Sequence, residues 1–166
     1  MRAPLDQVLE VLHVFAVFWF ISGLMGRTVA QAQARRATDL RDLDAAMRIS
    51  SVFELRMVRP GSLLLLLAGL LTAHLKGWPI LGPLHGHPPY WIFASLVLFL
   101  TGMMLVPTVF VPRGRHYRAA LDAARGEGTV TPRLAAAMAD RTVALAHAWE
   151  WIAVALITIL MVAKPF

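Results

Sequence analysis

Four long apolar runs dominate the sequence and decide what it can fold into. They cover approximately residues 8–26, 58–75, 90–111 and 143–163. A helix of about 20 apolar residues crosses the roughly 30 Å hydrocarbon core of a bilayer. The sequence therefore predicts an all-α fold, a transmembrane bundle of four helices. With no further segment of comparable size, residues 1–166 are predicted to form a single integral membrane domain.

The composition supports this interpretation. Hydrophobic residues make up 58% of the chain and charged residues 16%, whereas soluble domains are about 45–50% apolar. The additional apolar surface is expected to face the lipid bilayer. The first run lacks the basic head and the small-residue exit of a cleavable signal peptide, so we expect it to remain as a helix.

The distribution of basic residues predicts the orientation. Residues 27–59 contain seven arginines and residues 113–141 contain six, but residues 76–89 contain one basic residue, Lys76. Connections rich in arginine stay in the cytoplasm. Both termini and residues 76–89 are therefore expected outside, with the chain in a bacterial cytoplasmic (inner) membrane. The same bias explains the pI of about 11.0, and no nucleic acid is predicted as a partner.

The two arginine-rich connections are expected to be largely helical. Residues 38–57 repeat apolar side chains at helical spacing, which predicts an amphipathic cytoplasmic helix that continues into the second run. Helical sequence also flanks the turn GEGTVTPR in residues 113–141. The bundle should therefore carry cytoplasmic helical extensions. Pro60 and Pro107 predict local bends, because proline disrupts helical hydrogen bonding.

Ionisable residues inside a span are functional candidates by default. Glu10 and His13 share one face of the first helix, and His74 stands at the end of the second run. His13 and His74 could ligate haem b between antiparallel neighbours, with Glu10 tuning the site. His147 and Glu150 lie one turn apart in the fourth run, and the sequence assigns them no role.

Two other hypotheses remain open for the same residues. His13, His85, His87 and Glu10 could form an outward-facing site for copper or another transition metal, since imidazole suits these metals. Alternatively, the histidines only hydrogen-bond a neighbouring helix. The protein would then be a cofactor-free accessory or scaffolding subunit of a larger membrane complex, or a homo-oligomer. The chain has no cysteine, which excludes thiolate ligands and c-type haem attachment.

Several short motifs resemble two related groups of small bacterial membrane proteins. They are LHVFAVFWFISGL in the first run, RPGSLLLLLAGL in the second, and the final MVAKPF. These motifs resemble the HemJ type of protoporphyrinogen oxidase and a widespread uncharacterised four-helix family akin to copper-resistance protein D. That family carries only a domain-of-unknown-function label.

The resemblance implies a four-helix membrane fold and, by analogy with the HemJ type, a haem b ligand at His13. The HemJ type also carries a lysine near the start of its third helix, where this chain reads PPYWIFAS. This difference favours the uncharacterised family. The leading hypothesis is a small membrane protein that holds haem b near the outer leaflet in a redox role, without an assigned reaction.

Overall fold

The computed structural model describes residues 2–165, which form helices joined by short connections, with no strand. Four helices in this part are long and apolar enough to cross a membrane: Gln7–Arg36, Leu40–Leu75, Tyr90–Glu127 and Pro132–Ala163. The predicted all-α class is confirmed. The chain divides after Trp78 into two compact units. The assignment of the whole chain to one domain stays a prediction.

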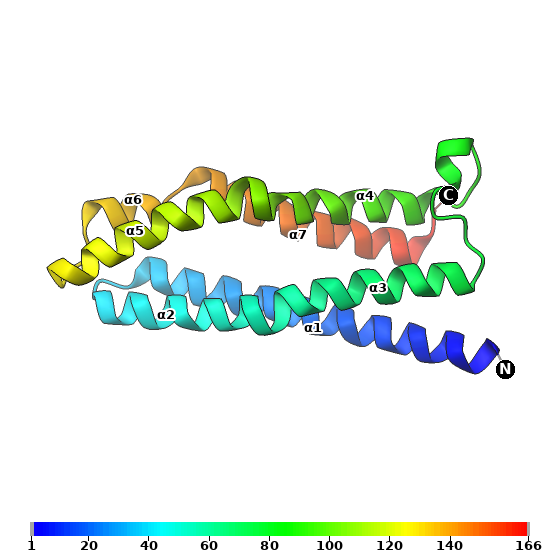
Figure 1. Cartoon of the computed structure of the whole chain (residues 1–166), viewed down its shortest axis with the longest axis horizontal. Coiled ribbons are helices and arrows are strands. Elements are labelled where there is room, and N and C mark those ends of the chain that lie inside the picture. Colours follow the sequence, from blue (N-terminus) through cyan, green and yellow to red (C-terminus); the bar gives the residue numbers. More distant parts are fainter. Residues whose placement is uncertain (1, 166) are drawn as a thin grey trace. The chain divides into compact units, whose positions relative to one another are not determined.

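The first unit is an antiparallel helical hairpin. A single long helix runs out, and a helix with a π-helical segment near its middle returns alongside it (Figure 1). Asp39 caps the returning helix by accepting a hydrogen bond from the N–H of Arg41 at 2.8 Å. The elements are α1 (Arg2–Arg36), α2 (Leu40–Phe53), the π-helical segment η1 (Glu54–Val58) and α3 (Arg59–Leu75).

Glycines hold the two helices of the first unit close together. A Cβ atom on Gly23 would lie 2.6 Å from the Cβ of Met57, and one on Gly61 would lie 3.1 Å from the Cα of Phe20. Helices in lipid associate through such close backbone approach, because no hydrophobic force drives them together. The glycines therefore determine which residues of α1 and α3 stand opposite each other.

The second unit is also built from helices that pack antiparallel, but here the helix with a π-helical segment precedes its partners in the chain. A helix with a π-helical segment comes first, and α6 and α7 pack back along it (Figure 1). The indole N–H of Trp149 on α7 donates to the hydroxyl of Thr101 on α4 at 3.0 Å. The elements are the 3₁₀ helix η2 (Gly82–His85), α4 (Tyr90–Leu105), the π-helical segment η3 (Val106–Phe110), α5 (Val111–Glu127), α6 (Pro132–Met138) and α7 (Arg141–Ala163).

Proline explains both π-helical segments. In each unit the segment is followed by one residue and then a proline, Pro60 after η1 and Pro112 after η3. A proline ring clashes with the carbonyl four residues earlier and donates no hydrogen bond to it. The preceding turn widens accordingly: Arg59 N–H bonds to the carbonyl of Glu54, five residues back. The sequence predicted bends at Pro60 and Pro107, and the structure has a π-helical segment at each.

A side chain from α1 compensates for the missing N–H of Pro60. In a regular helix that N–H would bond to the carbonyl of Arg56. The indole N–H of Trp19 donates to this carbonyl instead, at 3.3 Å. Trp19 therefore provides a donor for a backbone acceptor that the proline leaves without its usual N–H.

We expect Gly23→Ala to lower the free energy of unfolding by about 1–3 kcal/mol, because the added methyl overpacks the contact between α1 and η1. Gly102→Ala is the matched control, since a Cβ there would meet nothing within 4 Å. The control should be neutral or gain about 0.5–1 kcal/mol from helix propensity. Reversible unfolding in mixed micelles measures both variants. Equal stability of the two would contradict the packing role of Gly23.

We expect Trp19→Phe to cost about 1–3 kcal/mol in the native sequence, because it leaves the Arg56 carbonyl unsatisfied. The same substitution should cost less in a Pro60→Ala background, where residue 60 regains an N–H for that carbonyl. A double-mutant cycle of unfolding free energies isolates this coupling from the loss of ring size. An identical cost in both backgrounds would show that the indole bond does not compensate for the proline.

Candidate functional site

His13 packs directly against the backbone of α3. A Cβ atom on Gly69 would lie 3.0 Å from Cε1 of the imidazole and 3.4 Å from Nδ1. Nδ1 is buried and makes no hydrogen bond of good geometry within the described residues, although the Leu65 backbone lies close enough to interact with the ring. Gly69 thus makes room for a buried polar nitrogen inside an apolar span.

The structure does not bring His74 to His13. His74 lies five residues after Gly69 on α3, which is about 140° further round the helix and roughly 7.5 Å further along it. Its side chain is exposed. His74 is separated from His13 because of the register of the hairpin, in which the glycine contacts place Gly69 opposite His13. The geometry therefore offers no support for ligation by this pair.

The residues of the predicted metal site have other surroundings. Glu10 forms an ion pair with Lys76, whose ammonium also lies 5.1 Å from the centre of the Trp78 ring. His85 and His87, in the second unit, are exposed. Among the described residues, no group of three or more His, Cys, Asp or Glu side chains could hold a metal ion. The structure gives the metal hypothesis no support.

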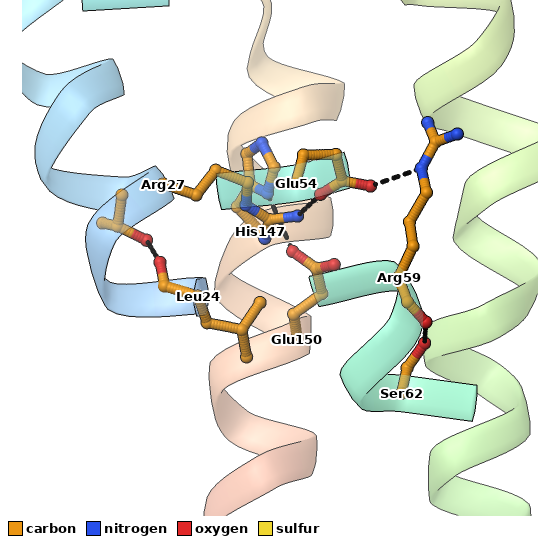
Figure 2. Close-up of polar contacts among 8 residues, drawn as sticks. Leu24, Arg27, Glu54, Arg59, Ser62, His147 and Glu150 are labelled. Carbon is orange, nitrogen blue, oxygen red and sulfur yellow. Dashed lines mark hydrogen bonds and ion pairs between the residues drawn. The ribbon is translucent and has the colours of Figure 1, made fainter. Parts of the chain in front are cut away.

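A charge cluster that sequence reasoning missed lies between α1 and η1 (Figure 2). Arg27 is 5% exposed, and its Nη1 donates to Oε2 of Glu54 at 2.9 Å. Nε of Arg59 donates to the other oxygen, Oε1, at 3.1 Å. One carboxylate thus binds two guanidinium groups. A signal was present in the sequence, because Glu54 is the one acidic residue between positions 45 and 121.

His147 and Glu150 form a pair within α7 (Figure 2). Nδ1 of His147 lies 2.8 Å from Oε2 of Glu150, and the two side chains are mostly buried. The Phe110 ring of η3 stacks on the imidazole with ring centres 4.7 Å apart. The sequence singled out both residues, and their local spacing brings them together as expected for positions three apart on a helix.

Comparison with known families matches residues 7–165 to one described as "Predicted integral membrane protein (DUF2269)". The chain belongs to this family. No curated protein and no solved structure matches the chain. The DUF2269 description agrees with four helices able to span a membrane, and it confirms the expected uncharacterised membrane family. It carries no statement about HemJ, copper-resistance protein D or a cofactor.

We expect Arg27→Ala to destabilise this DUF2269 protein by about 1–3 kcal/mol, because it removes the buried hydrogen-bond donor of Glu54 and leaves only Arg59 on that carboxylate. Arg59→Ala is the matched control on the same carboxylate. The side chain of Arg59 is 60% exposed, so its loss should cost about 1 kcal/mol or less. Unfolding in mixed micelles ranks the two variants. A larger loss for Arg59→Ala would reverse the assignment of Arg27 as the structural partner.

Proposed function

We propose that this DUF2269 protein binds haem b through His13 and serves a redox role near the outer face of a bacterial inner membrane. The observation that carries the proposal is the buried Nδ1 of His13, which lies against Gly69 without a well-formed hydrogen bond. A polar nitrogen held this way in hydrocarbon is costly, and such residues in spans generally serve function.

The surroundings of His13 suit an iron ligand. An imidazole that binds a metal through one nitrogen usually directs the other at a backbone carbonyl or carboxylate, which fixes the ring. The Leu65 backbone, which interacts with the ring of His13, would take this role for Nδ1 once the site is occupied. Nε2 is then the proposed ligand atom. His74, which the register places elsewhere, is not proposed as the second ligand.

In this proposal, Gly69 and the apolar residues of the first unit have separate roles around His13. Gly69 keeps the imidazole seated against α3, because any side chain there would displace it. The apolar residues of the two helices exclude water from the ring. Haem b, when bound, would supply one-electron chemistry with a potential set by its ligands and burial.

The distribution of arginines supports an orientation with both termini outside. Residues 27–59 and 113–141 carry thirteen of the sixteen basic residues, and such connections favour the cytoplasm. His13, near the start of the first span, then lies in the outer half of the membrane. The proposed site would exchange electrons with a donor or acceptor on that side.

Absorption spectroscopy of the detergent-purified protein tests the proposal. The oxidised protein should show a Soret band that shifts on dithionite reduction, with α and β bands appearing. His13→Ala should abolish or alter these bands, whereas His74→Ala is the control that should keep them. Circular dichroism of both variants checks that the helices are intact.

Two results would overturn the haem proposal. One is a visible spectrum that stays flat for the native protein supplied with haem. The other is unchanged bands in His13→Ala. If other proteins also co-purify at fixed stoichiometry, a flat spectrum favours the cofactor-free accessory subunit. Metal analysis of the same sample tests whether His85→Ala and His87→Ala remove a bound transition metal.

A further inference from the structure

The continuous helix α4–η3–α5 changes from apolar to basic at the start of α5. Exposed apolar side chains precede this boundary, Val97, Leu100 and Met104 on α4 and Val111 at the start of α5, each 42–59% exposed. Arg115 and Arg118 follow Val111 by four and seven residues on the same face of α5, and both are exposed. We refer to these six residues as the α4–α5 stripe.

The two arginines of the stripe differ from their neighbours in having no ion pair among the described residues. Arg113, on the other side of α5, forms an ion pair with Asp140, and Arg125 forms one with Asp122. Arg115 and Arg118 stand three positions apart on one helix face, where like charges repel. An anion bound between them would remove this repulsion.

The depth of the two arginines matches lipid headgroups. Val111 is the last residue of the apolar run. Arg115 and Arg118 follow it by four and seven residues, which is roughly 6 and 10 Å along a helix. A headgroup layer extends about 5–8 Å beyond the hydrocarbon core. Long arginine side chains at these positions can reach the phosphates.

We propose that the α4–α5 stripe binds an anionic phospholipid, with an acyl chain along its apolar part and the phosphate between Arg115 and Arg118. Guanidinium groups suit this ligand because their planar N–H donors match phosphate oxygens. With the orientation proposed above, the lipid belongs to the cytoplasmic leaflet. The site lies wholly in the second unit and does not depend on haem.

Lipid binding to the full chain in mixed nanodiscs of phosphatidylglycerol and phosphatidylcholine tests this site. Native mass spectrometry of the released protein measures which lipid stays bound. The native protein should retain phosphatidylglycerol in preference to phosphatidylcholine. Each basic residue near a membrane surface strengthens anionic lipid binding about fivefold, so Arg115→Gln with Arg118→Gln should weaken this preference roughly 30-fold.

Arg125→Gln with Arg133→Gln is the matched control, since it removes the same charge from the same unit further from the apolar run. It should keep the preference for phosphatidylglycerol. An equal loss of the preference for phosphatidylglycerol in both double variants would overturn the proposed site. A native protein that shows no preference for phosphatidylglycerol over phosphatidylcholine would also overturn it. Displacement of the lipid by inorganic phosphate alone would instead assign the arginines to a free anion and overturn the lipid proposal. Circular dichroism confirms that each variant is folded.

Discussion

Hydrocarbon contains no water to bond a free backbone carbonyl or N–H, and much of this structure follows from that constraint. It limits each spanning segment to a helix, and it makes proline expensive. At Pro60 the helix widens into η1, and the Arg56 carbonyl accepts a hydrogen bond from the indole of Trp19. The donor comes from α1. The hydrogen bonding of one helix therefore depends on its packing against another.

The same constraint governs the polar side chains. Hydroxyls of Thr28, Thr72 and Thr158 each donate to the carbonyl four residues earlier, at 2.7–2.8 Å. Charged groups are paired, as Glu54 is with Arg27 and Glu150 is with His147. Nδ1 of His13 and the hydroxyl of Ser95 on α4 depart from this pattern, because their burial is not matched by a well-formed hydrogen bond. Of these two side chains, His13 is the one whose nitrogen can ligate a metal. This departure, more than the presence of a histidine, supports a ligand-binding role.

Features that depend on neighbouring residues could be predicted from the sequence. The four helices follow from the lengths of the apolar runs, and local bends were expected at Pro60 and Pro107, which lie next to η1 and within η3. The pairing of His147 with Glu150 follows from their spacing of three. Contacts between distant residues could not be predicted in this way. Arg27 and Glu54 are 27 positions apart, so no helical repeat connects them.

The sequence by itself determined that this is an all-α membrane protein with four apolar helices, and it singled out His13. The length and polarity of a segment are local properties, and they suffice for those conclusions. Only the tertiary structure decided which residue faces His13. The register of α1 against η1 and α3 depends on the summed close contacts of Gly23, Gly61 and Gly69, and neither helix carries that information alone. Those contacts place Gly69 opposite the imidazole and leave His74 on another face.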